Sequence, residues 1–207
     1  MNPQTLRAIV AGPVGAIECA IDAPGDGAPK GVAVVCHPHP QHAGTMDNKV
    51  VTTLARAFVG LGWRAVRFNF RGVGGSAGVW GNGVGEIDDA LAVIAAQRRG
   101  GEPLMLAGFS FGASIASHAA QRLPADAKPR RLLLVGPSVV NFPLAPVSDD
   151  ALVIHGEADD VVPLAAVLDW ARPQALPVVV VPGAGHFFHG QLSLLKSLVT
   201  RSLRIDS

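Results

Sequence analysis

Residue types that together can activate a hydroxyl group follow three separate apolar segments of this chain. Ser110 stands in a Gly-x-Ser-x-Gly pattern, Asp159 and Asp160 follow a second segment, and His186 follows a third. A serine hydroxyl is a poor nucleophile unless a base takes its proton and an acid holds that base in the right tautomer. We therefore expect Ser110 to be a nucleophile and His186 its base. Either acid could orient the base, and the other is expected to cap a helix that starts near Pro163.

The Gly-x-Ser-x-Gly pattern occurs twice, and its context separates the two copies. A nucleophile elbow needs a buried strand before the serine and a helix after it, with glycines that relieve close backbone contacts. The apolar segment Pro103–Ala107 leads into Ser110, and a segment with helical periodicity follows it. Around Ser76, in Gly74–Gly78, there are only loop-forming residues. Ser76 is therefore interpreted as a loop hydroxyl.

Two of the other histidines are assigned structural roles, and a third, His189, is interpreted as a solvated residue at a helix start. His186 is favoured over His189 as the base because it directly follows the last apolar segment, whereas His189 lies near a helix start. His118 falls within a predicted helix, and His155 ends an apolar strand. The chain contains no tyrosine. Mechanisms that need a catalytic tyrosine are therefore excluded.

When a serine nucleophile attacks a carbonyl carbon, the carbonyl oxygen becomes an oxyanion, and two backbone N–H groups are needed to bind it. Phe111, directly after the nucleophile, is expected to supply one of them. The prolines of the segment His37–Gln41 have no N–H, so its possible donors are His37, His39 and Gln41. The second N–H is assigned to His39, which the flanking prolines hold stiffly. His37, His39 and His42 lie close together beside Cys36, so a metal site is the alternative for this loop. No second cluster of ligands is visible, and we expect no metal.

The segment Gly72–Ala77 matches the dinucleotide-binding pattern Gly-x-Gly-x-x-Ala after an apolar run. That pattern requires a helix to open at its third small residue, but further glycines prolong this segment up to Gly85. We therefore interpret Arg71–Gly85 as a surface loop. No dinucleotide or other cofactor is expected.

The elements that must position these residues alternate along the chain. Apolar, β-branched segments separated by segments of helical period are typical of an α/β protein with a mostly parallel sheet and helices on both faces. A short turn, Gly12–Gly15, predicts that the first two of eight strands form an antiparallel hairpin. Ligands bind at the carboxyl ends of the strands in such sheets, where the serine, the acid and the histidine would meet. The predicted strands are Leu6–Ala11, Ala16–Asp22, Val32–Cys36, Arg64–Phe68, Leu104–Gly108, Leu132–Gly136, Ala151–His155 and Val178–Val181. The predicted helices are Lys49–Val59, Ile87–Arg98, Phe111–Arg122, Leu164–Ala171 and Gln191–Arg204.

Length and composition narrow the class of protein further. The 207 residues, with 49% hydrophobic and 16% charged, suit one domain over residues 1–207. A net charge of +1 provides no basic field for nucleic acid. No apolar run approaches the roughly 20 residues that span a bilayer, and the N-terminus lacks the pattern of a signal peptide. Cys19 and Cys36 are too few for a disulfide scaffold and are expected to be reduced and buried. We expect a cytoplasmic protein with no membrane partner, and its oligomeric state stays open.

Six motifs in this order resemble the α/β-hydrolase superfamily, and in particular its small lidless serine esterases related to dienelactone hydrolases. The motifs are Cys36-His-Pro-His-Pro, Asp47-Asn-Lys, Asn69-Phe-Arg-Gly-Val-Gly, Gly108-Phe-Ser-Phe-Gly, His155-Gly-Glu-Ala-Asp and Gly185-His. The resemblance implies that Asp159 is the acid, and it supports Ser110 and His186. It also implies that Arg71 is structural and paired with a carboxylate that the sequence does not identify.

Two departures from that family shape the expected activity. The segment Pro137–Asp150 is too short for a cap domain, so the site should be open and unsuited to long lipids. Cys36 lies before the oxyanion loop and not in the elbow, so the cysteine nucleophile of dienelactone hydrolases is absent. We expect a carboxylesterase-type serine hydrolase that cleaves small esters through an acyl-enzyme. The alternatives are a catalytically silent or accessory binding protein of the same fold, and an acyltransferase or peptidase using the same triad.

Overall fold

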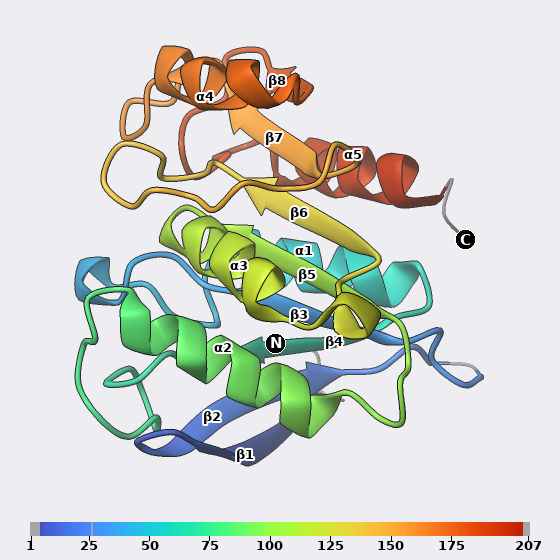
Figure 1. Cartoon of the computed structure of the whole chain (residues 1–207). Coiled ribbons are helices and arrows are strands. Elements are labelled where there is room, and N and C mark those ends of the chain that lie inside the picture. Colours follow the sequence, from blue (N-terminus) through green and yellow to red (C-terminus); the bar gives the residue numbers. More distant parts are fainter. Residues whose placement is uncertain (1–4, 26, 205–207) are drawn as a thin grey trace.

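An eight-stranded sheet lies at the centre of the protein, for which a computed structural model describes residues 5–25 and 27–204. The strands are β1 (Leu6–Gly12), β2 (Gly15–Asp22), β3 (Val32–Cys36), β4 (Arg64–Phe68), β5 (Leu104–Phe109), β6 (Arg131–Val135), β7 (Leu152–Gly156) and β8 (Val178–Val181). Their spatial order is β1-β2-β4-β3-β5-β6-β7-β8 (Figure 1). β2 pairs antiparallel with both β1 and β4, and all other neighbours are parallel. The predicted α/β architecture with its antiparallel hairpin is confirmed.

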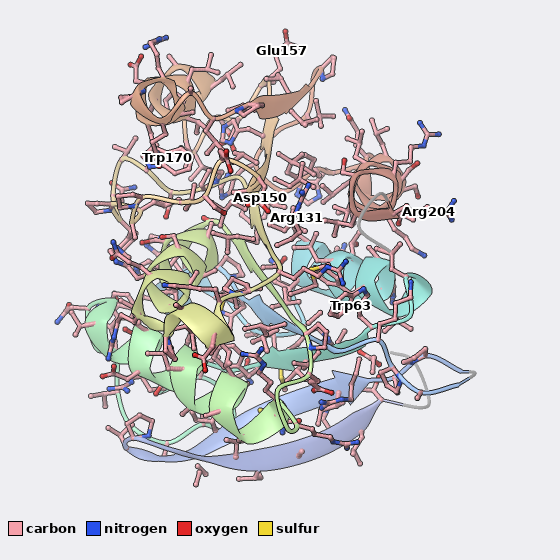
Figure 2. All side chains as sticks on the ribbon, turned by 45° about the vertical axis from the view of Figure 1, so that its right-hand side comes forward. Trp63, Arg131, Asp150, Glu157, Trp170 and Arg204 are labelled. Atoms are coloured by element: carbon pink, nitrogen blue, oxygen red, sulfur yellow. The ribbon has the colours of Figure 1, made fainter. Side chains whose placement is uncertain are left out.

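Helices cover both faces of this sheet (Figure 1). The helices are α1 (Lys49–Gly60), α2 (Val84–Gln97), α3 (Phe111–Arg122), α4 (Leu164–Ala171) and α5 (Leu192–Arg204). Residues of α2, α3 and α4 belong to one buried cluster, and residues of α1 and α5 belong to the other. Trp170 of α4 packs against the first cluster and Trp63, after α1, belongs to the second (Figure 2). Because helices cover both faces of the sheet, β3, β4, β5 and β7 are fully buried, and most of their residues are apolar.

The start of α2 differs from the predicted one by three residues. The helix begins at Val84 and not at Ile87, after Gly83 with a φ of 86°. The carboxylate of Glu86 accepts hydrogen bonds from the N–H groups of Gly81 and Gly83, at 2.8 Å each. These bonds satisfy donors at the helix start, so the helix extends into a segment whose glycines indicate a loop. The strand ends differ from the predicted ones by a single residue at most.

The segment between β6 and β7 contains no helix over residues 137–150, as expected for a chain without a cap. The one sheet and its two helix layers comprise all the strands and α-helices of the described residues. Within residues 5–25 and 27–204, no helix combines the length and the apolar character that a membrane span requires. Cys19 and Cys36 are buried and free, at positions in β2 and β3.

Candidate active site

Ser110 lies at the junction of β5 and α3, in a backbone conformation with a φ of 56° and a ψ of −120°. Few residues other than glycine adopt a positive φ, so packing on both sides must hold this turn. A Cβ on Gly108 would collide with the carbonyl of Gly112, and a Cβ on Gly112 would collide with the carbonyl of Cys36. Both glycines of the pattern are therefore required by close backbone contacts. The predicted elbow geometry is present.

The structure brings Ser110, His186 and Asp159 together at the carboxyl ends of the strands. His186 Nε2 lies 2.9 Å from Ser110 Oγ, and His186 Nδ1 lies 2.7 Å from Asp159 Oδ2. The imidazole is 3% exposed and Ser110 is 8% exposed. Because a carboxylate only accepts hydrogen bonds, Nδ1 carries the proton and Nε2 is left to accept from the serine hydroxyl. His189 is exposed and lies outside this chain of contacts.

Asp159 is held by the turn that follows it. Its Oδ1 accepts hydrogen bonds from the N–H groups of Val161 at 3.0 Å and Val162 at 2.8 Å. Burial alone would raise the pKa of Asp159, but the hydrogen bonds from His186 and Val162 outweigh it and hold that pKa below its ordinary value. The carboxylate therefore stays ionised and can stabilise a protonated His186.

The prediction that Asp160 caps the following helix is wrong. Asp160 is exposed, and α4 starts after Pro163 without any side-chain cap. The two oxygens of Asp159 have separate partners, since one binds His186 and the other binds the N–H groups of Val161 and Val162 in the turn before α4. The spacing of two adjacent acids does not reveal that one carboxylate does both.

His155, predicted to end an apolar strand, is the last but one residue of β7 and also contacts the acid. The ring is fully buried, and its Nε2 donates to the carbonyl of Val162 at 2.9 Å. The same nitrogen lies 3.4 Å from Asp159 Oδ2. Burial lowers the pKa of His155, so the ring stays neutral at ordinary pH. The sequence does not predict this contact, because a histidine near a strand end gives no local signal of what it meets across the turn.

The loop after β3 packs directly against the elbow, since the carbonyls of Cys36 and His37 both lie against Gly112. Phe111 is the first residue of α3, where backbone N–H groups have no partner within the helix. The carbonyl of His39 accepts hydrogen bonds from the N–H groups of His42 and Gly44, both at 3.0 Å, which folds the loop into a tight turn. The two predicted oxyanion donors thus belong to segments in contact.

The histidines of this loop are used in different ways. His37 is buried, donates from Nδ1 to the carbonyl of Pro38 at 2.6 Å and accepts at Nε2 from the N–H of Phe70 at 3.0 Å. Burial lowers its pKa to about 4. The rings of His39 and His42 instead stack with a centroid separation of 4.6 Å. In the part of the chain that the structure describes, no three His, Cys, Asp or Glu side chains gather as metal ligands do.

The remaining polar motifs build the loop after β4. Ser76 Oγ donates to the carbonyl of Asn69 at 2.6 Å and accepts from the N–H of Glu18 at 3.0 Å. Arg71 binds Asp89 through two side-chain hydrogen bonds, of 3.0 and 2.7 Å. Asp89 is the carboxylate that the sequence did not identify, because it lies on α2 with no local spacing to Arg71. No helix begins at Ala77, so the loop lacks the geometry of a dinucleotide site.

Comparison with known proteins agrees with this geometry. The sequence model of the serine aminopeptidase S33 family matches residues 27–148, more than half of the chain. A lidless α/β serine hydrolase from Xanthomonas campestris is similar, with 38% identity, coverage of 99% of this chain and 95% of that chain, and a TM-score of 0.87. An α/β serine hydrolase homologue from Coxiella burnetii has 40% identity, coverage of 98% of each chain and a TM-score of 0.84. An uncharacterized protein from Rickettsia prowazekii is 34% identical over 173 residues, which are 76% of this chain and 71% of that protein. The chain therefore belongs to the serine aminopeptidase S33 family and is a lidless α/β serine hydrolase.

Proposed function

We propose that the protein hydrolyses small carboxylic esters through an acyl-enzyme, with Ser110 as nucleophile, His186 as base and Asp159 as the acid that orients the base. The observation that carries this proposal is the continuous chain of short contacts from Ser110 Oγ through His186 to Asp159. A buried hydroxyl next to an imidazole lone pair can lose its proton as it attacks a carbonyl carbon.

In the acylation step, Ser110 Oγ forms a bond to the ester carbonyl carbon while its proton moves to His186 Nε2. The carbonyl oxygen takes the electron pair of the C=O bond, and the N–H groups of Phe111 and His39 bind the resulting oxyanion. The intermediate then collapses, the bond to the alcohol oxygen breaks, and His186 returns the proton to that oxygen. The acyl group remains on Ser110 as an ester.

In the deacylation step, a water molecule takes the place of the alcohol. His186 removes a proton from the water as its oxygen attacks the acyl carbon, and the same N–H groups bind the second oxyanion. Collapse breaks the bond to Ser110 Oγ, which regains its proton from His186, and releases a carboxylic acid. Asp159 stabilises the protonated imidazole in both steps and keeps its own charge.

Two features support small, uncharged esters as the substrates. The short segment between β6 and β7 carries no cap that would enclose a long acyl chain. Arg71, the cation of the loop after β4, is committed to Asp89 through two hydrogen bonds. Both cysteines are buried free thiols, which fits the cytoplasmic location that we propose for the enzyme.

A fluorophosphonate probe tests the proposed function, because it reacts only with an activated nucleophile. Intact-mass analysis and peptide mapping should find one adduct, on Ser110, in the wild type and in Ser76→Ala, and none in Ser110→Ala. Labelled protein should lose its hydrolysis of 4-nitrophenyl acetate in step with adduct formation. A folded wild-type protein that takes no label would favour the silent binding protein instead, and faster turnover of amino-acid 4-nitroanilides than of esters would favour a peptidase.

A further inference from the structure

Three rings from three separate loops meet over the ring of Phe111, the residue that follows the proposed nucleophile. His39 comes from the loop after β3, Trp80 from the loop after β4, and Phe142 from the segment between β6 and β7. Their centroids lie 5.1, 5.2 and 4.8 Å from that of Phe111, which directly follows Ser110. His39 also lies 4.6 Å from Trp80 and 5.0 Å from Phe142. We name His39, Trp80 and Phe142 the aromatic wall.

The aromatic wall differs from the core in its exposure. Phe111 beneath it is 1% exposed, whereas His39, Trp80 and Phe142 are each partly exposed. Aromatic residues are only 5% of this chain, so such a cluster beside one serine is a local concentration. Ring faces and edges that remain accessible can take a further ring in stacked or edge-to-face contact.

The loops that carry Trp80 and Phe142 are held by hydrogen bonds of backbone N–H groups next to each ring. Next to Trp80, the N–H of Gly81 donates to Glu86 on α2 at 2.8 Å. The N–H of Phe142 donates to the carbonyl of Ser138 at 3.0 Å. These bonds fix the backbone next to each ring, so a ligand would meet a wall that is largely formed before binding.

The residue after Phe142 is also held, by the helix that begins at the elbow. The carbonyl of Pro143 accepts from Ser114 Oγ at 2.9 Å and from His118 Nε2 at 3.0 Å. Both donors lie on α3. His118 thus has a structural role, as predicted, because it binds the segment that carries Phe142 to the helix that follows Ser110.

The charges on this side of the site favour an uncharged ligand. Burial and the neighbouring His42 lower the pKa of His39, so its ring is neutral at ordinary pH. Arg71 is paired with Asp89, and Glu86 accepts two backbone N–H groups. A group that binds here therefore gains ring contact and little ionic attraction.

The chemistry of the proposed reaction assigns this side to the acyl group. His186 must protonate the leaving alcohol, so the alcohol lies on the side of His186, where the ring of Phe187 is 5.1 Å away and 42% exposed. The oxyanion faces the N–H groups of Phe111 and His39. We assign the remaining substituent of the carbonyl carbon, the acyl group, to the rings that pack on Phe111.

We infer that the aromatic wall is a specificity-determining site that takes the planar aromatic acyl group of an arylcarboxylic ester. This inference rests on the proposed ester hydrolysis and adds its substrate class. An acyl group bound at the wall stays there after the alcohol has left, so the wall acts on deacylation as well as on acylation.

A matched pair of esters tests this inference. 4-Nitrophenyl benzoate and 4-nitrophenyl cyclohexanecarboxylate share a leaving group and differ in whether the six-membered ring is flat and aromatic. Trp80→Leu and Phe142→Leu should each lower the benzoate-to-cyclohexanecarboxylate ratio of kcat/KM by about three- to tenfold. The rate of hydrolysis of the preformed benzoyl-enzyme should fall as well. Trp80→Phe, which keeps a ring, should retain a ratio within about twofold of the wild type.

Controls separate this inference from the proposed function. Trp170→Leu removes an aromatic side chain of α4 (Figure 2), a helix that carries no member of the wall, and it should leave the ratio unchanged. If the wild type is labelled on Ser110 and hydrolyses 4-nitrophenyl acetate, but the wall variants keep the wild-type ratio, the inference is overturned and the proposed function stands. If only the alcohol preference changes and benzoyl-enzyme hydrolysis does not, the wall binds the alcohol and the inference is again overturned. A folded wild type with neither label nor turnover overturns both.

Discussion

Ser110 and Ser76 occupy the same Gly-x-Ser-x-Gly pattern, but their hydroxyl groups have different partners. Ser110 Oγ lies 2.9 Å from the imidazole of His186. Ser76 Oγ donates to the carbonyl of Asn69 and accepts from the N–H of Glu18, so both of its hydrogen-bonding roles are filled by backbone. A hydroxyl that faces a base can be activated, whereas one bound between two backbone groups only closes a loop.

The glycines of the two patterns are also required for different reasons. At the elbow, the atoms that exclude a Cβ are backbone carbonyls, of Gly112 and of Cys36. In the loop, Gly74 and Gly78 have φ values of 54° and 85°, and the atoms nearest to an added Cβ belong to side chains. The pattern alone therefore carries little information. Its meaning comes from the buried strand before the serine and the helix after it.

The largest effect that this comparison predicts is on turnover. Ser110→Ala should lower kcat/KM for 4-nitrophenyl acetate by about four to six orders of magnitude, because it removes the hydroxyl that would form the proposed acyl-enzyme. Ser76→Ala should leave kcat/KM within about twofold of the wild type, since its hydroxyl meets no reacting atom. Steady-state kinetics on both purified variants is the measurement. Equal losses in the two variants would contradict the distinction.

A smaller effect is expected from the first glycine of each pattern. Gly108→Ala forces a Cβ against the carbonyl of Gly112, so the start of α3 must shift and carry Ser110 with it. A displacement of about 1 Å at the nucleophile costs on the order of a hundredfold in kcat. Gly74→Ala meets the side chains of Asn69 and Glu18, which can move, so activity should stay near the wild-type value while the unfolding free energy falls by about 1–2 kcal/mol. Thermal unfolding and turnover of both variants test this, and a normal kcat in Gly108→Ala would refute the close-contact explanation.

The sequence predicts the elements around Ser110 well because their signals are local. Apolar segments of strand length and the periodic segment after Ser110 indicate the order and type of these elements, and they place the element ends within a residue or two. Contacts between distant segments have no such signal. Asp89 as the partner of Arg71, His155 beside Asp159 and the ring of Phe142 over Phe111 all depend on how loops fold across the sheet edge. The start of α2 differs from the predicted one for a related reason, since Glu86 satisfies the N–H groups of a glycine-rich turn.

The buried His37 contacts both the elbow at Ser110 and the loop after β4 that contains Ser76. Its low pKa leads to a prediction of how stability depends on pH. The carbonyl of His37 lies against the elbow at Gly112, and its ring accepts a hydrogen bond from the N–H of Phe70. The carbonyl of Asn69, the residue before Phe70, accepts a hydrogen bond from the hydroxyl of Ser76. Burial lowers the pKa of His37 from 6.5 to about 4. Between these values the unfolded chain binds a proton that the native protein does not, so the native state loses stability as the pH falls through this range.

The expected contribution of His37 is roughly 2–3 kcal/mol of unfolding free energy, fully present above pH 6.5 and lost by about pH 4. Urea unfolding at several pH values between 7 and 4 should show this loss in the wild type. His37→Gln cannot take up a proton and keeps an acceptor for the N–H of Phe70, so its stability should depend less on pH over the same range. The same slope in both proteins would show that another group causes the loss.

The smallest expected effect is a loss of stability when the hydroxyl of Ser76, which takes no part in the proposed reaction, is removed. Ser76→Ala removes both hydrogen bonds and leaves the carbonyl of Asn69 and the N–H of Glu18 without their partner at a site that is 7% exposed. The unfolding free energy should fall by about 1–2 kcal/mol. The exposed Ser148 provides a matched control, and Ser148→Ala should change stability by no more than about 0.5 kcal/mol. If Ser76→Ala is as stable as Ser148→Ala, the loop does not need the hydroxyl. If it is less stable but fully active, one sequence pattern serves catalysis at one position and loop closure at the other, and only the partners of the hydroxyl distinguish them.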